Sequence, residues 1–331
     1  MRKNLLAACT LFILSSLAAG VRWEDYKQAG LPWDPIEFTG CPLSTCDADE
    51  LASQVFTDDD YYPSLAVTYM RPGFWAEDFQ LRFNYSETVV RPDLREITPS
   101  SYIDPLTDAI VSGSPNVTPS TVENWDLRAE WFFESGDTFT MSLFYKDITD
   151  PIEMFQSAAF EEALSMQIIN AESAEVYGME FEWLKNLGFL GNTFSNFFVA
   201  GNATVLDSEI VAGDKADAPT NEKRPMAGAS DFAFNAQLGW DSDDGMHSAM
   251  LIYNVFDERL LFGGRLGQPD AYEQPFNSLD FTYFFYATDQ FTVKLKAQNL
   301  LDEAISIEQD GVETFTVTPG QGFSLDLRYQ F

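Results

Sequence analysis

Few side chains in this sequence have the type and spacing that catalysis requires. The single imidazole, His247, follows the turn-like segment 241–245, where it is expected to be solvated rather than paired with a nucleophile. Glu180 and Glu182 stand two residues apart, so in a strand they share one face. Such a pair could serve general acid–base catalysis, but on an alternating strand it favours a charge network. The sequence therefore predicts no enzyme and no catalytic, cofactor-binding or metal-ligating residue.

The first twenty residues look like a secretory signal peptide. Arg2 and Lys3 form a charged start, residues 5–17 an apolar core, and residues 18–20 are small. Cleavage after Gly20 would leave residues 21–331 as the mature chain. The alternative is that residues 17–24 form an ordinary β-strand whose likeness to a signal peptide is accidental.

Two cysteines lie close together in a segment rich in Pro, Gly and Asp. Cys41 and Cys46 are expected to form a local disulfide, because export places an even pair in an oxidising compartment. Two free thiols are the alternative. A metal site would need further ligands, and His247 is far away in the sequence.

Composition narrows the class of protein. The 331 residues carry a formal charge of −33, and 15% of them are aromatic. No apolar run of about 18–20 residues follows the N-terminal segment, so the sequence predicts no membrane helix. The acidic balance argues against nucleic acid as a partner, and it allows contact with anionic surfaces only through bridging cations. The charge is expected to solubilise long exposed loops.

The last ten residues carry the strongest structural signal. Apolar side chains occupy every odd position from Phe323 to Phe331, and polar side chains fill the positions between them. This period of two describes a strand with one apolar and one polar face. A transmembrane β-barrel ends in this way, because its outer face meets lipid and its lumen meets water. A final strand that ends on phenylalanine also resembles the sorting signal read by the bacterial outer-membrane assembly machinery, which makes Phe331 a candidate sorting residue.

The same alternation recurs along the chain in about 12 segments. Short connections are predicted near 72–73, 135–137, 188–192, 241–245 and 288–290, and long ones at about 29–60, 87–121, 149–173, 207–227, 257–276 and 302–320. This asymmetry is typical of outer-membrane barrels, which have short periplasmic turns and long extracellular loops. Charged strand residues fall on the polar face: Arg82, Arg128, Glu130, Glu180, Glu182, Lys294, Lys296, Asp326 and Arg328. The predicted fold is all-β, an antiparallel transmembrane β-barrel of about 12 strands.

Four segments resemble the C-terminal barrel of TonB-dependent receptors. They are residues 86–96 (SETVVRPDLRE), 116–153, 170–180 (NAESAEVYGME) and 296–303 (KAQNLLDE), in the order and spacing of that family. Gly178 is expected to make room for a neighbour or to bend its strand. Asn299 and Asp302 suit a strand-to-loop transition through side-chain-to-backbone hydrogen bonds. The resemblance covers most of the chain from about residue 60 to residue 331.

The resemblance implies nutrient uptake across the outer membrane of a Gram-negative bacterium. Members of the family capture a siderophore, vitamin or oligosaccharide on their extracellular loops and draw energy from TonB. Their 22-stranded barrel follows a plug domain and a TonB-contacting box. Residues 21–331 have room for a barrel domain alone, so we expect a part of such a barrel that does not perform energised transport by itself. A passive 12-stranded channel or a non-functional fragment is the alternative.

The expected partners follow from this location. They are outer-membrane lipid and lipopolysaccharide, the outer-membrane assembly machinery, and a small-molecule ligand at the extracellular loops. Contact with TonB is not expected without a plug. Whether the strand that begins at Val21 pairs with the strand that ends at Phe331 decides whether about 12 strands form a closed barrel, because an open edge would leave backbone groups unpaired in lipid.

Overall fold

The computed structural model describes residues 14–29, 55–98, 100–105, 107–158 and 164–331. The predicted disulfide between Cys41 and Cys46 lies outside these residues. No helix within the described ranges is long and apolar enough to cross a membrane.

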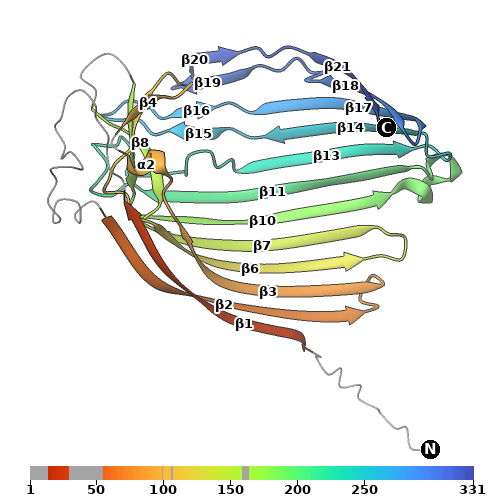
Figure 1. Cartoon of the computed structure of the whole chain (residues 1–331), viewed down its shortest axis with the longest axis horizontal. Helices are drawn as coiled ribbons and strands as arrows, with labels where there is room; N and C mark the ends of the chain where they lie inside the picture. Colours follow the sequence, from red (N-terminus) through yellow and green to blue (C-terminus); the bar gives the residue numbers. More distant parts are fainter. Residues whose placement is uncertain (1–13, 30–54, 99, 106, 159–163) are drawn as a thin grey trace, which may run out of the picture.

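One large antiparallel sheet dominates the fold (Figure 1). Within the described residues its path runs through 12 strands, and a further two-residue strand, β12 (Lys223–Arg224), pairs with β11. The path consists of β1 (Leu14–Ala29), β2 (Val55–Pro72), β3 (Asp78–Val90), β6 (Ser120–Phe132), β7 (Thr138–Thr149), β10 (Ser173–Asn186), β11 (Phe197–Val211), β13 (Phe232–Asp241), β14 (His247–Phe256), β17 (Phe276–Thr288), β18 (Phe291–Gln298) and β21 (Gly322–Tyr329). The prediction of an all-β antiparallel fold with about 12 strands is confirmed.

In the part of the chain that the structure describes, the sheet is curved but not closed. Among the described residues, β1 pairs only with β2, and β21 pairs only with β18. Figure 1 shows these two strands at opposite margins of the sheet. The two strands whose pairing would close the barrel are therefore apart in this structure.

Connections alternate in length along the sheet, as predicted. The short turns span residues 73–77, 133–137, 187–196, 242–246 and 289–290, and they lie at the end of the sheet where the chain finishes (Figure 1). The long connections after β3, β7, β11, β14 and β18 gather at the other end. By the rule for outer-membrane barrels, the short turns face the periplasm and the long connections face the cell exterior.

β1 includes residues 14–20, which belong to the segment that the sequence predicts as a signal peptide. Its residues pair with β2 throughout, for example Ala18 with Ala66 and Val21 with Pro63. Leu17, Val21 and Trp23 project from one face and are exposed. The boundary predicted at residue 20 thus falls inside a strand, and the signal peptide stays a prediction.

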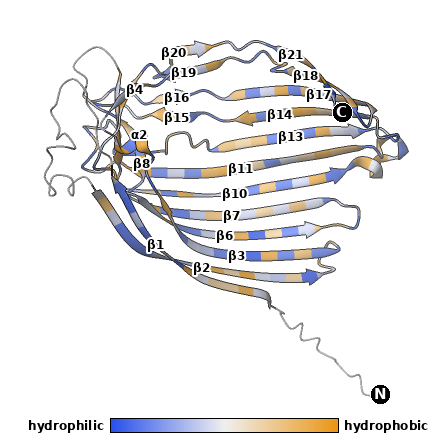
Figure 2. Ribbon diagram, in the orientation of Figure 1, coloured by the Kyte–Doolittle hydropathy of each residue, from blue (hydrophilic) through white to orange (hydrophobic). Residues whose placement is uncertain are grey.

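Hydrophilic and hydrophobic residues alternate along the strands of the large sheet (Figure 2). The register sets aromatic side chains of the outer face side by side on neighbouring strands. Toward the loops, a row of aromatic side chains crosses four neighbouring strands: Tyr85, Trp125, Tyr145 and Tyr177. Toward the turns, a second row crosses the same strands: Phe79, Trp131, Phe139 and Trp183. Six residues separate the rows on each strand, about 20 Å along it. Between them lie aliphatic side chains, including Leu127 (40% exposed) and Leu143 (40% exposed). This is an apolar band between two aromatic girdles, the surface that lipid covers.

The larger hydrophobic core cluster lies in the long connections, and a second one includes Ala174 and Ile210 at the loop ends of β10 and β11. We call the described parts of residues 91–119, 150–172, 212–231, 257–275 and 299–321 the loop cap. It contains helix α2 (Leu94–Ile97) and two four-stranded sheets: β4 (Ser101–Ile103), β5 (Ile110–Ser112), β9 (Ser165–Asn170) and β8 (Ile152–Gln156) in one, and β15 (Arg259–Phe262), β16 (Ala271–Glu273), β19 (Ile305–Gln309) and β20 (Val312–Val317) in the other. Val111 and Ile168 from the first sheet share one core with Phe262 and Ile307 from the second. The cap therefore ties connections from both halves of the large sheet together.

The sequence predictions for Gly178 and Asn299 are confirmed, whereas the one for Asp302 stays a prediction. A Cβ on Gly178 would lie 2.4 Å from the Val205 carbonyl oxygen and 2.8 Å from the Phe144 ring, so glycine makes room for its neighbours. Asn299 directly follows β18 and has φ 51°, and its side chain donates to the carbonyl of Glu303 (3.0 Å) and accepts from the Glu303 N–H (2.9 Å). These contacts turn the chain from the barrel wall into the loop cap.

Candidate functional site

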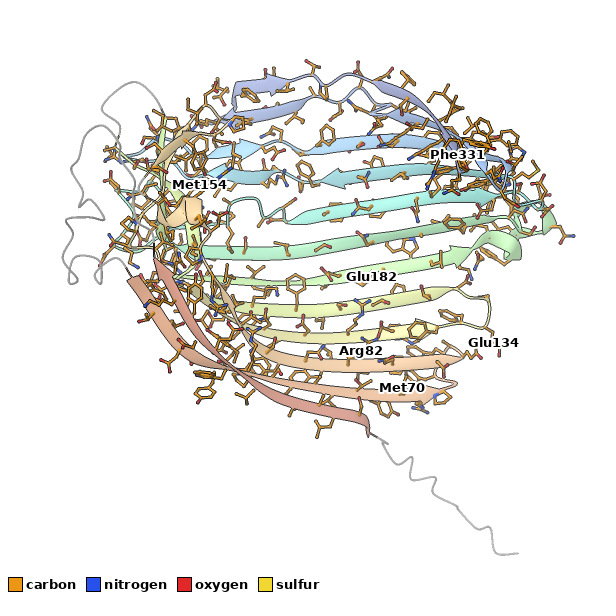
Figure 3. All side chains as sticks on the ribbon, viewed as in Figure 1. Met70, Arg82, Glu134, Met154, Glu182 and Phe331 are labelled. Carbon is orange, nitrogen blue, oxygen red and sulfur yellow. The ribbon has the colours of Figure 1, made fainter. Side chains whose placement is uncertain are left out.

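A cavity of about 410 Å³ opens in the loop cap. Its lining comes from α2, β4, β8, β9 and the segment before β13: Asp93, Arg95, Glu96, Tyr102, Ile152, Glu153, Met154, Ile168 and Ala227. Figure 3 shows Met154 at the loop end of the molecule, far from Phe331 at the turn end. The cavity thus lies on the side of the barrel that faces the exterior.

Among the described residues that line this cavity, Arg95 of helix α2 is the one with a cationic side chain. Asp93 and Glu96 are engaged in a capping box, in which Asp93 accepts from the Arg95 N–H (2.7 Å) and Glu96 accepts from the Asp93 N–H (2.8 Å). The exposed guanidinium of Arg95 lies 5.6 Å from the Tyr102 ring centroid. Among the described residues, no carboxylate forms an ion pair with Arg95. A cation beside an aromatic ring can bind an anionic group of a ligand.

A buried ion pair supports the wall of this cavity. Arg224 Nη1 donates to Glu153 Oε1 at 2.8 Å, and the side chains are only 2% and 9% exposed. The guanidinium also lies 4.5 Å from the Phe155 ring centroid, and Glu153 accepts from the Ala227 N–H at 3.0 Å. The pair joins β8 to β12, so it holds the loop after β7 against the loop after β11.

Charged residues on the lumen face pair along the wall. Arg82 and Arg128 both contact Glu130, at 2.8 and 3.2 Å, and Arg128 also contacts Glu182 at 3.0 Å. These four side chains belong to β3, β6 and β10, which are near neighbours in the sheet (Figure 3). Glu180 does not join this ion-pair set and lines a separate wall cavity of about 280 Å³ with Lys146. The predicted charge network is therefore confirmed for Glu182. Its ion pairs run along the wall instead of across the lumen.

Carboxylates form a row on the outer face, two residues beyond the loop-side aromatic girdle. Register sets them side by side on five successive strands: Glu87, Glu123, Asp147, Glu175 and Glu209. Lys223 contacts Glu209 at 2.6 Å. Like charges directly opposite each other repel. No group of three or more such side chains in the described residues is arranged to hold one metal ion.

His247 and Phe331 both lie at the turn end of the barrel. His247 Nδ1 lies 2.7 Å from the Tyr283 hydroxyl, and its ring stacks on Phe285 at 4.9 Å. This contact explains the histidine as part of the aromatic packing at the periplasmic rim. Phe331 is fully exposed at the end of the chain, and its role as a sorting residue stays a prediction.

A buried carboxylate fastens the turn after β6. Asp137 is 3% exposed and pairs with Lys185, and it accepts from the Asn186 N–H (2.8 Å) and side-chain amide (2.9 Å). Burial alone would raise the pKa of Asp137, but the hydrogen bonds from Lys185 and Asn186 outweigh burial and hold that pKa below its usual range. The turn is thus tied to the end of β10.

The Asp137→Asn variant is expected to be less stable at pH 7 by about 1–3 kcal/mol, because it removes the charge that Lys185 contacts. A depressed carboxyl pKa contributes stability that is complete above the unfolded value, about 3.9, and is lost as pH falls through the folded value. Urea unfolding of both proteins in detergent should therefore show a gap in free energy at pH 7 that narrows below about pH 4. A gap of equal size at low pH would mean that shape, not charge, matters at this turn.

Comparison with known proteins places the chain in a family. Residues 14–300 match the family described as TonB dependent receptor-like, beta-barrel. The chain therefore belongs to the TonB-dependent receptor β-barrel family, whose members are outer-membrane transport proteins and not enzymes.

The individual relatives are distant and longer. The iron-regulated outer membrane virulence protein of Vibrio cholerae is 24% identical over 228 residues, which are 66% of this chain and 33% of that protein. A variant of the ferric enterobactin receptor PfeA from Pseudomonas aeruginosa superposes with a TM-score of 0.57 at 16% identity, covering 84% of this chain and 41% of that one. The ferric-catecholate import receptor Fiu from Escherichia coli gives 0.61 at 16% identity, covering 95% and 42%. The chain thus spans a third to two fifths of the length of these relatives.

Sequence reasoning missed the residues that shape the cap cavity. Arg95 and Glu153 both fall inside segments that resemble the family, but nothing in their spacing shows that they meet. Arg224 stands in a segment without any recognised pattern, and it is brought to Glu153 only by the folding of two separate loops.

Proposed function

We propose that this chain is the barrel part of an outer-membrane receptor that binds a scarce nutrient at its loop cap, with an anionic ferric siderophore as the favoured class of ligand. The cap cavity carries the proposal, because it lies at the exterior end and presents Arg95 beside Tyr102. The relatives named for ferric enterobactin and ferric-catecholate import support this class. The matched family region is the barrel, so energised transport through TonB is not proposed for residues 1–331 alone.

Ferric enterobactin is a suitable first probe for the cavity. The Arg95→Glu variant should bind it about tenfold or more weakly than the wild type, since a hydrogen bond to a charged group contributes about 1.5–3 kcal/mol. Fluorescence quenching of the refolded protein would measure the dissociation constants. Arg71→Ala is the matched control, because Arg71 contacts Phe74 at the turn end of the barrel and should leave binding unchanged. If the Arg95→Glu variant bound ferric enterobactin as tightly as the wild type does, the cavity would not be the binding site.

A passive channel is the second candidate function. The ion pairs of Arg82, Glu130, Arg128 and Glu182 run along the wall, so in the described part of the chain these charges do not bridge the lumen. Planar-bilayer conductance of the purified chain tests this candidate. A closed barrel that conducts ions would support a channel, and a silent one would exclude it.

Lipopolysaccharide is the proposed partner of the outer surface near the cap. The row of carboxylates beyond the girdle would lie at the level of lipid phosphates, and the two sets of negative charges repel unless divalent cations lie between them. Removal of Mg²⁺ and Ca²⁺ with a chelator should lower the unfolding temperature of the protein in lipopolysaccharide bilayers but not in neutral detergent. A variant with Glu123→Gln and Glu175→Gln should respond less, and an equal response would contradict a role for this row.

A further inference from the structure

The apolar band between the two aromatic girdles is shorter than the hydrocarbon layer of a membrane. The girdles lie six residues apart on each strand, which is about 20 Å along the strand. Barrel strands are tilted by about 35–45°, so this length corresponds to only about 15 Å along the membrane normal, whereas the apolar band of such barrels is about 25 Å tall. The remaining height of about 10 Å must come from surface beyond one of the girdles.

The loop end of the barrel cannot supply this surface. The row of carboxylates that includes Glu87 and Glu175 lies only two residues beyond the loop-side girdle, on the same outer face. A charged side chain on the lipid face is costly in the hydrocarbon layer and is tolerated near the interface. These carboxylates therefore mark the exterior boundary of the hydrocarbon layer, and the remaining height must lie at the turn end.

The turn between β2 and β3 folds its aromatic side chains onto the outer face. The Phe74 ring centroid lies 4.9 Å from that of Phe79, a member of the turn-side girdle, and 5.1 Å from the Arg71 guanidinium. Trp75 stacks on Phe74 at 4.7 Å between ring centroids and is 79% exposed. Its φ of 62° is uncommon for a bulky residue, and such strain persists only where the surroundings stabilise it. An indole exposed to water would gain no such stabilisation.

The turn between β10 and β11 also carries its apolar side chains on the outer side. The Phe189 ring centroid lies 5.1 Å from the Lys185 amine, and the Phe194 ring centroid lies 6.1 Å from that of Phe197. Lys185 and Phe197 both face outward by the alternation of their strands. Phe189 is 68% exposed, Leu190 56% and Phe194 43%. Both turns thus continue the apolar outer surface beyond the turn-side girdle.

The adjacent turn, residues 242–246, is polar. It reads Ser-Asp-Asp-Gly-Met, and Ser242 donates to Asp244 at 2.5 Å within it. Asp243 accepts from the Asn196 side chain at 2.6 Å, so this turn and the turn before β11 lie side by side at the same end of the barrel. A position at the turn end therefore does not by itself require exposed aromatic side chains.

We propose that the turns 73–77 and 187–196 enter the periplasmic leaflet and bury Trp75, Phe189, Leu190 and Phe194 among the glycerol and upper acyl groups of phospholipid. Their apolar surface is continuous with the band that lipid covers. Apolar side chains of an interfacial segment reach about 5–10 Å into the boundary between headgroups and acyl chains, which agrees with the remaining height of the band. The turn 242–246 stays in water beside them.

Spin labels that report the depth of each turn test this proposal. The full chain carries Cys9→Ser, Cys41→Ser and Cys46→Ser and one labelled cysteine, at Trp75→Cys, Leu190→Cys or Asp243→Cys. Each protein is refolded in phospholipid vesicles, with heat-modifiable migration as the criterion of folding. Electron paramagnetic resonance then compares collisions of the label with oxygen, which dissolves in lipid, and with a water-soluble nickel chelate present on both sides of the membrane. The ratio of oxygen to nickel collisions should be at least about threefold higher at positions 75 and 190 than at position 243, because only the first two lie below the headgroups.

A change of charge tests whether the aromatic side chains hold the turn in lipid. With Phe189→Glu and Phe194→Glu in the same chain, the ratio at Leu190→Cys should fall to that at Asp243→Cys, because carboxylates stay in water. Thr193→Gln is the matched control, since Thr193 is an exposed polar residue of the same turn. This control should leave the ratio at Leu190→Cys unchanged.

Two results would overturn the proposal. Equal ratios at positions 75, 190 and 243 in the folded, heat-modifiable protein would place the two aromatic turns in water. Few collisions with either reagent at positions 75 and 190 would show that protein, and not phospholipid, covers these turns.

Discussion

Replacing Arg224 by alanine is expected to unfold the loop cap under conditions in which the wild-type cap is folded. The substitution leaves the Glu153 carboxylate buried without its cation, and breaking a buried pair in this way costs about 3–5 kcal/mol. It also removes the contact of the guanidinium with Phe155. Amide hydrogen exchange should therefore accelerate throughout β8 and β12, while the barrel strands keep their protection.

Two matched variants separate charge from general damage. In the double variant Arg224→Met and Glu153→Gln, both charges are gone and the glutamine oxygen can still accept from the Ala227 N–H, so most of the stability should return. Lys223→Ala changes the neighbouring residue, whose pair with Glu209 is exposed, and should cost less than about 1 kcal/mol. An Arg224→Ala protein as stable as the Lys223→Ala protein would show that the buried pair does not support the cap.

The second large effect is expected at Asn170, which is 2% exposed where β9 leads into β10. Its side-chain oxygen accepts from the Thr118 N–H, and its amide donates to the carbonyls of Thr118 and Asp150, each at 2.8 Å. One side chain thus joins the exterior ends of β6, β7 and β10. Asn170→Ala should cost about 3 kcal/mol or more, because it leaves buried backbone groups unpaired at about 1–3 kcal/mol each.

The nearly isosteric Asn170→Asp variant tests hydrogen-bond direction. Its carboxylate can still accept from Thr118, but it faces the carbonyls of Thr118 and Asp150 as a second acceptor and carries a buried charge. Burial raises the pKa of such a carboxyl, so the loss of stability should be complete near pH 7 and should lessen as pH falls through the raised value. Thermal unfolding at pH 7 and pH 5 would measure this. An Asn170→Asp protein as stable as the wild type at pH 7 would mean that these hydrogen bonds contribute little.

The sequence predicts the barrel strands well because their signal is local. Lipid on one side and water on the other force a period of two, which is visible in a stretch such as Phe323 to Phe331 without any knowledge of neighbours. Turns such as 135–137 and 288–290 carry their own composition signal, and the structure places them as predicted. The family resemblance likewise rests on residues that act locally, such as Gly178 and Asn299.

The structure of the loop cap could not be predicted from local sequence patterns. Its core joins Val111, Ile168, Phe262 and Ile307, which are far apart in the chain, and each stands in a short segment without a long periodic pattern. The sequence marks Asn170 only as the first residue of the segment 170–180, which resembles the TonB-dependent receptors. Its role becomes clear when Thr118 and Asp150 are seen beside it.

The sequence by itself determined the class of fold, the inward or outward direction of each strand residue and the end of the barrel at which the long connections lie, because these depend on alternation and turn composition within a few residues. Only the tertiary structure decided which strand residues stand side by side, and so the aromatic girdles, the row of carboxylates and the Arg128 network. It also decided the cap cavity around Arg95 and the separation of β1 from β21. Those features depend on register and on contacts between distant segments, which no local pattern encodes.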